Sequence, residues 1–173
     1  MIFSINQTFP DMNNLIEWKG KNWYAVVRYP DGRFRGLLSQ LIEELSENKN
    51  VSYTNFLLSH AYGCTNTLWT ELQSKGYNPK KLDKPITTDS ECAVISMIKC
   101  AGQFLNIPEV QNLSAIADPL NYEAEFRSAG FEYLKSLKYL SSPDYLYAGD
   151  ILIDSYGYMA VNLSHGQFVR EEA

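Results

Sequence analysis

Apolar positions in the first two thirds of the chain recur at helical spacing. Leucine and isoleucine repeat every three to four positions over residues 37–45, where glutamates point away, and this predicts a surface helix. A second helix is expected over residues 65–75, with Gly76 as its C-terminal cap. A third helix is expected after the cap candidates Thr87–Ser90 and should end at Gly102. Its apolar side chains cover most of the circumference, which is typical of a central, buried helix.

Flanking segments complete an α+β pattern. Residues 22–29 are rich in β-formers and end at a Pro-Asp-Gly turn, which predicts a strand or hairpin. A further helix is expected over residues 119–129, closed by Gly130. The apolar period then changes to two, which predicts an antiparallel meander. Its expected strands are residues 131–134, 145–147, 151–153 and 158–163, followed by a turn at 164–166 and a returning strand at 167–170.

Helices first and a sheet afterwards indicate an α+β domain. We divide the sequence into residues 1–50, an N-terminal extension or accessory hairpin and helix, and residues 51–173, the main domain. The length of 173 residues suits one compact unit with a sizeable core.

Charge and hydropathy exclude several classes of partner. The net charge of −5 comes from scattered acidic residues, whereas nucleic-acid-binding proteins usually carry a basic stripe, so no nucleic-acid partner is expected. The N-terminus has neither the charged start nor the apolar run of a signal peptide. No run is long enough to span a membrane, so we expect a protein made in the cytoplasm.

The chain has three cysteines, Cys64, Cys92 and Cys100, and they form no CxxC motif. An odd, sparse count predicts no disulfide framework. With only two histidines, His60 and His165, a structural zinc site is not expected either, and no cofactor is indicated.

Cys92 is the candidate nucleophile because it falls in the first turn of the buried third helix. Exposed N–H groups and the helix dipole favour a thiolate at that position. The alternative is that Cys92 is an inert core residue, since free cysteine is among the most buried residue types. Cys100, two turns later in the same apolar helix, is expected in the core.

The order of segments around Cys92 resembles the NlpC/P60 family of papain-like peptidoglycan hydrolases, in particular lysins of phages of Gram-positive hosts. The resembling segments are Val51-Ser52-Tyr53, Leu68–Leu72, Gly76–Pro79, Thr88–Cys92, Ala129–Glu132 and Ala148–Ile153. The resemblance covers roughly residues 51–170. It implies a papain-like fold in which N-terminal helices pack on a C-terminal antiparallel meander. It also implies that Cys92 is the nucleophile and that Tyr53, Asp89 and Glu91 contact substrate.

The chain departs from the family where a histidine should open the strand after the Gly-Asp segment. Tyr158 takes that position, and Arg170 falls near the third polar position. A tyrosine hydroxyl, with a pKa of about 10, accepts a proton poorly at neutral pH, and arginine stays protonated. His165 lies in the predicted turn, roughly 20 Å along an extended strand from Tyr158. His60 reaches the cleft only if its loop folds back, whereas Arg170 near Cys92 would hold a thiolate without a histidine.

Three functions follow from these observations, and enzymatic activity is left open. The first is a catalytically impaired lysin-type domain, retained to bind cell-wall peptides or as a structural or tail component of a phage particle. The second is an active cysteine peptidase or amidase that cleaves peptidoglycan stem peptides. The third is a protein-interaction module whose resemblance is coincidental. Under the first two, the expected partners are bacterial cell-wall peptides or phage structural proteins, and the protein would be virion-associated or released at host lysis.

Overall fold

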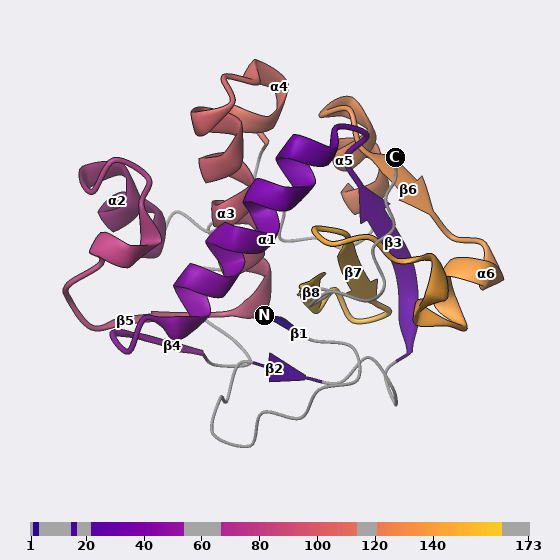
Figure 1. The fold of residues 1–173 in the computed structure, drawn as a ribbon, viewed down its shortest axis with the longest axis horizontal. Coiled ribbons are helices and arrows are strands. Elements are labelled where there is room, and N and C mark those ends of the chain that lie inside the picture. Colours follow the sequence, from indigo (N-terminus) through magenta and orange to yellow (C-terminus); the bar gives the residue numbers. More distant parts are fainter. Residues whose placement is uncertain (1, 4–14, 17–21, 54–66, 114–120, 164–173) are drawn as a thin grey trace.

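The computed structural model describes residues 2–3, 15–16, 22–53, 67–113 and 121–163, and within them it has the α+β fold that the sequence predicts (Figure 1). The strands are β1 (Ile2–Phe3), β2 (Leu15–Ile16), β3 (Trp23–Arg28), β4 (Val51–Tyr53), β5 (Ile86–Thr88), β6 (Glu132–Leu134), β7 (Ile151–Asp154) and β8 (Met159–Asn162). The α-helices are α1 (Gly32–Glu47), α2 (Thr67–Ser74), α3 (Ser90–Phe104), α4 (Pro108–Gln111), α5 (Tyr122–Ser128) and α6 (Leu137–Leu140). Two 3₁₀ turns, η2 (Pro79–Lys81) and η4 (Pro143–Tyr145), complete the described elements.

The main sheet has the order β2-β1-β8-β7-β3-β6, and β4 pairs with β5 in a separate parallel ribbon. The pairs β8–β7, β7–β3 and β3–β6 are antiparallel, while β1 is parallel to both β2 and β8. Two apolar clusters lie on opposite faces of this sheet. The main cluster joins the sheet to α1 and α3, and the second, smaller cluster includes Trp23, Val26, Leu146, Leu152 and Ala160.

Residues 22–50 are built into the sheet and its helical layer. Strand β3 lies between β7 and β6 and bonds to both, rather than forming a hairpin of its own. Helix α1 packs on α3, and in Figure 1 it crosses in front of that helix. The strand over residues 22–29 and the helix around 37–45 are confirmed, and the helix is longer than the apolar period suggested. The division drawn at residue 50 stays a prediction about the sequence.

Helix α3 is the central helix, as its apolar pattern predicts. Asp89 is its N-cap, and nearly every residue from Ser90 to Gly102 is buried. The prediction that Gly102 ends the helix is wrong, because the helix continues to Phe104. Gly102 instead allows a close approach of α4: a Cβ at this position would lie 2.9 Å from Cγ1 of Val110.

The C-terminal strands β6, β7 and β8 confirm three of the predicted segments, but the strand expected at residues 145–147 is wrong. Pro143 opens the 3₁₀ turn η4 instead. The backbone polar groups of this segment pair with side chains, since the carbonyl of Tyr145 accepts from Arg28 and the N–H of Tyr147 donates to Asp150. The turn and strand expected over residues 164–170 lie outside the described residues.

Other helix boundaries agree with the sequence in part. Helix α2 is confirmed, and Gly76 follows it in a left-handed conformation with φ of 66°. Helix α5 is confirmed from Tyr122 onward, and Gly130 closes it with φ of 94°. The start expected at Pro119 lies outside the described residues. Within the described residues, no helix is both long enough and apolar enough to cross a membrane.

Candidate functional site

The candidate site is the N-terminus of α3. Asp89 caps this helix, and its Oδ1 accepts a hydrogen bond from the backbone N–H of Cys92 at 2.8 Å. This contact satisfies one of the backbone donors that a helix start leaves without an intrahelical partner. Asp89, Ser90, Glu91 and Cys92 are all buried, with exposed fractions between 0 and 8%. Two carboxylates, a hydroxyl and a sulfur are therefore held together within one helical turn.

The segment that leads into β8 lies directly against this helix start. The backbone N–H of Met159 donates to Oγ of Ser90 at 3.2 Å. On the other side, the hydroxyl of Tyr122 on α5 donates to the carbonyl of Gly157 at 3.4 Å. The backbone over residues 157–159 is thus fixed between α3 and α5. The fold brings the start of β8 to the start of α3.

Two tyrosines, Tyr53 and Tyr122, lie near the helix start. Tyr53 ends β4 and is paired with Thr88, the residue before the cap Asp89. Burial raises the pKa of Tyr53 well above its usual value. Burial also raises the pKa of Tyr122, and the charge of Glu91 and a hydrogen bond with it act in the same direction. These phenols remain neutral at physiological pH and serve as hydrogen-bonding groups.

Tyr158 lies just before β8, beside the same backbone segment. Its pKa is raised by burial, and further by the neighbouring charge of Asp154 and by Tyr53. Its ring packs against the second apolar cluster, whereas the next residue, Met159, belongs to the main cluster that includes α3. Its assignment to the histidine position stays a prediction.

Cys92 is half of a disulfide, and its sulfur is fully buried with the rest of the residue. The other half lies outside the described residues. Cys100, the other described cysteine, is free and buried, and burial raises its pKa to about 12, as expected for an inert core thiol. The sequence predicted no disulfide framework, and the single bond at Cys92 was not foreseen. A sulfur in a disulfide is not a thiolate, so it is not a nucleophile until it is reduced.

Four other residues singled out in the sequence are not among the described residues. Arg170, His60, His165 and Cys64 all lie outside the described residues. The structure places Asp89, Glu91 and Cys92 at the start of α3, and Tyr53 pairs with Thr88 just before the cap. Tyr158 interacts with Tyr53, and its place at the site stays a prediction. Among the residues that the structure describes, no group of histidine, cysteine and carboxylate side chains could hold a metal ion.

Sequence reasoning missed Ser90 and Tyr122 as members of the site. Ser90 looked like one of several cap candidates, and only the contact with Met159 distinguishes it. Tyr122 lies in a helix more than 30 residues along the chain from Gly157, which it contacts. No local sequence pattern predicts that contact, because it depends on how α5 packs beside the loop before β8.

Comparison with known proteins gives one family. The family described as the endolysin-like domain, ELLD, matches residues 10–169. No curated protein and no solved structure matches the chain. The match covers the great majority of the sequence, including β3, α1 and the whole candidate site. It indicates a function related to that of phage lysins and binding to a cell-wall substrate. The chain belongs to the endolysin-like domain family.

Proposed function

We propose that this chain is a lysin-type domain that binds cell-wall peptides and in which hydrolysis is impaired. The observation that carries the proposal is the state of Cys92, which opens the central helix but forms a disulfide and is fully buried. A cysteine hydrolase needs this sulfur as an accessible thiolate. Under this proposal the first turn of α3 carries the former nucleophile position without a reactive thiolate.

Among the residues that the structure describes, no histidine stands at the helix start to carry the proton, which supports the same proposal. Thiol hydrolysis needs a group that takes the proton from sulfur and returns it to the leaving amine. At the proposed histidine position, Tyr158 has a pKa raised above the usual value for tyrosine by burial, so its hydroxyl accepts a proton even less readily. General acid–base catalysis is typically worth about 10²–10⁴-fold in rate. Without it, even a reduced Cys92 would be a very slow enzyme.

The proposal assigns peptide binding to the polar groups around this helix start. The candidate groups are the buried carboxyls of Asp89 and Glu91 and the hydroxyls of Ser90 and the nearby tyrosines. Such groups suit the amine and amide groups of a stem peptide. In a phage particle, the same domain would serve as a structural or tail component that holds the particle to the cell wall.

The test measures binding and hydrolysis separately, with oxidised and with reduced protein. Purified peptidoglycan from a Gram-positive bacterium is incubated with the chain, then pelleted. Protein in the pellet reports binding, and soluble peptide fragments in the supernatant report hydrolysis. We expect co-sedimentation without fragment release in either redox state. Fragment release by the unmodified protein that disappears in Cys92→Ala would contradict impairment, and the matched control is Cys100→Ala, which removes the buried free thiol of the same helix.

The second candidate is a working cysteine peptidase or amidase that is active once Cys92 is reduced. It is favoured by one contact, the hydrogen bond from the Cys92 N–H to Asp89, which places the sulfur in the first turn of a 15-residue helix. A reduced thiol there gains thiolate character from the helix dipole. This candidate predicts fragment release only after reduction, with a pH–rate profile that reports a lowered thiol pKa.

A further inference from the structure

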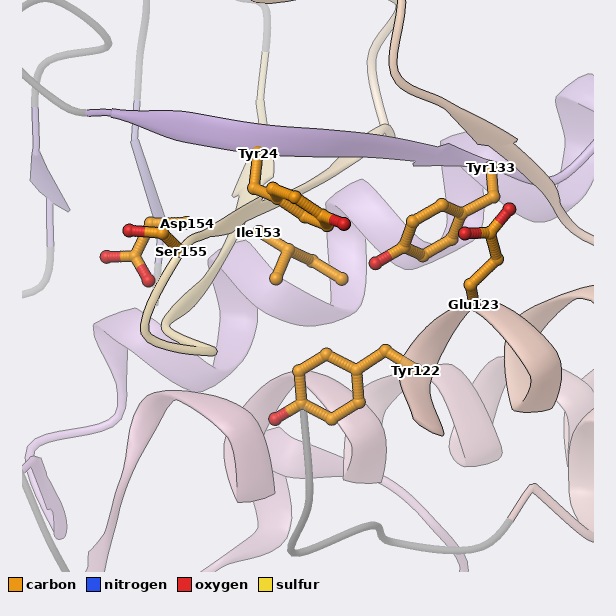
Figure 2. A pocket seen from close by; sticks show the side chains of 7 residues that line it. All are labelled: Tyr24, Tyr122, Glu123, Tyr133, Ile153, Asp154 and Ser155. Carbon is orange, nitrogen blue, oxygen red and sulfur yellow. The ribbon is translucent and has the colours of Figure 1, made fainter. Parts of the chain in front are cut away.

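A second polar site lies beside the helix start, in a pocket of about 230 Å³ between the sheet and α5 (Figure 2). The residues that line it are Tyr24, Tyr122, Glu123, Tyr133, Ile153, Asp154 and Ser155. Figure 2 shows Asp154 and Ser155 at one end and Glu123 with Tyr133 at the other. The rings of Tyr24 and Tyr122 and the side chain of Ile153 lie between these ends. The pocket therefore has aromatic walls and a carboxylate at each end.

A break in the register of β3 brings Tyr24 to this pocket. Trp23 pairs with Asp154 and Ala25 pairs with Ile153, so Tyr24 is an extra residue in the ladder between β3 and β7. A bulge of this kind re-aims a side chain, and such bulges are frequent next to functional sites. Trp23 packs in the second apolar cluster and Ala25 in the main one, while Tyr24 remains 50% exposed. Packing alone does not account for a half-exposed tyrosine at that point.

The charges around the pocket differ at its two ends. Glu123 accepts from Lys135 at 2.7 Å and from Arg127 at 3.0 Å, and these contacts lower its pKa, so its charge is offset. Asp154 uses Oδ1 for the backbone N–H groups of Tyr156 and Tyr158. Within the described part of the chain, no donor reaches its Oδ2, and no cationic side chain lines the pocket. The Asp154 end therefore carries the negative charge that a ligand would meet.

The aromatic walls also favour a cation. The Nζ of Lys135, which is not one of the lining residues, lies 6.0 Å from the ring centroids of both Tyr24 and Tyr133, so an ammonium group already stands near this pair of rings. Aromatic faces attract ammonium groups, and the attraction grows when water is excluded. Burial raises the pKa of Tyr133 to about 12, so its phenol stays neutral and does not form an ion of its own near neutral pH.

We infer that this pocket binds an organic ammonium group, with its aliphatic stem along Ile153 and the tyrosine rings and its charge at Asp154. In the proposed cell-wall function, the natural source of that group is the free side-chain amine of a diamino acid in a stem peptide. The chemistry of the pocket does not depend on that source. The site is distinct from the helix start at Cys92, although Tyr122 borders both.

The experiment titrates the full chain with a short peptide that carries one free lysine side chain and follows backbone amide NMR shifts. The comparison ligand is the same peptide with the lysine Nε-acetylated, which keeps the stem and removes the charge. We expect shifts centred on residues of β3, β6 and β7, with acetylation weakening binding at least about tenfold, as for the loss of a hydrogen bond to a charged group. Equal binding of the acetylated peptide, or of N-acetylglucosamine, would overturn the inference.

Two variants locate the site. Asp154→Asn keeps the Oδ1 acceptor for the turn and removes the charge, so we expect about tenfold weaker binding with an unchanged melting temperature. Tyr24→Leu removes one ring face, and its matched control is Tyr145→Leu, since Tyr145 is 51% exposed and does not line the pocket. We expect Tyr24→Leu to weaken binding about three- to tenfold and Tyr145→Leu to leave it unchanged. Equal effects of these two tyrosine variants would overturn the placement.

Failure of this inference and failure of the proposed function give different results. Co-sedimentation with peptidoglycan combined with no response to the lysine peptide would reject the amine pocket and keep the proposed function. A response to the free lysine peptide without co-sedimentation would keep the pocket, reject the proposed function and indicate another source of the amine.

Discussion

Two buried aspartates of the fold, Asp150 and Asp89, have different surroundings. Asp150 is fully buried and accepts from Nε and Nη2 of Arg28 at 2.9 and 2.6 Å, and from the N–H of Tyr147 at 2.7 Å. Arg28 in turn donates to the carbonyl of Tyr145, and its guanidinium lies 3.8 Å from the ring centroid of Tyr147. These contacts join β3, β7 and the segment before β7 into one polar unit within the fold.

Asp89 has a buried side chain too, but it belongs to a different kind of cluster. Its Oδ1 binds the N–H of Cys92, and its sequence neighbours Ser90 and Glu91 are buried beside it. The loop amide of Met159 donates to Ser90, and the hydroxyl of Tyr122 interacts with Glu91 and Asp89. In the Asp150 unit, by contrast, burial lowers the pKa of Arg28, but the hydrogen bond and the charge of Asp150 raise it by more, so the pKa of Arg28 lies above its usual value. We conclude that the Gly-Asp segment joins the strands through a buried ion pair, whereas the Asp-Ser-Glu-Cys segment is the buried start of α3, to which the proposed recognition role is assigned.

The largest expected effect is on the stability of the Asp150 unit. Asp150→Ala leaves the guanidinium of Arg28 buried without its carboxylate, and breaking a buried ion pair in this way costs about 3–5 kcal/mol. The measurement is the free energy of unfolding from urea denaturation. The control is Asp83→Ala, which breaks an exposed bridge to Lys75 of similar length and should give no resolvable change. An Asp150→Ala variant as stable as the unmodified chain would mean that this unit does not hold the strands.

Gly149 gives the next largest effect. It has φ of 85°, and a Cβ at this position would clash with the backbone carbonyl of Arg35 on α1. Gly149→Ala combines a left-handed backbone with overpacking, so we expect a loss of about 2–4 kcal/mol in the free energy of unfolding. Gly76→Ala is the matched control, because Gly76 has φ of 66° and no atom within 4 Å of the added Cβ. It should lose only the conformational part, about 1–2 kcal/mol. Equal losses would show that the approach of α1 to Gly149 does not matter.

The difference between the two aspartates also explains what the sequence could predict. The apolar periods located β3, α1, α2, α3 and the β7–β8 pair, because each element shows one face or the whole surface to the core. They did not predict the 3₁₀ turn at Pro143–Tyr145. That segment is held by side chains of Arg28 and Asp150, which are over 110 residues apart along the chain.

In the candidate site, too, the sequence predicted local features and missed contacts between distant segments. Asp89 was predictable as a cap from local chemistry, and Cys92 followed as a first-turn residue. The disulfide at Cys92 was not predictable, since a count of cysteines does not tell which sulfurs meet in space. The bulge at Tyr24 was not predictable either. It is a shift in the pairing of β3 with β7, and the sequence of one strand does not show how that strand pairs with another. Contacts between distant segments decide both features.

The smallest expected effect on stability, and the sharpest separation of the two regions, is at Asp89 itself. Asp89→Ala removes the cap of α3 and should cost about 1 kcal/mol in the free energy of unfolding. Asp89→Asn keeps an oxygen acceptor for the Cys92 N–H and should change stability by only a few tenths of a kcal/mol.

If the helix start serves recognition, both variants should weaken co-sedimentation with peptidoglycan, because both remove the charge. The control is Asp31→Ala, which removes the cap of α1 and should lower stability without changing binding. Unchanged binding by Asp89→Asn would make Asp89 a structural residue like Asp150, and the contrast between the two regions would disappear.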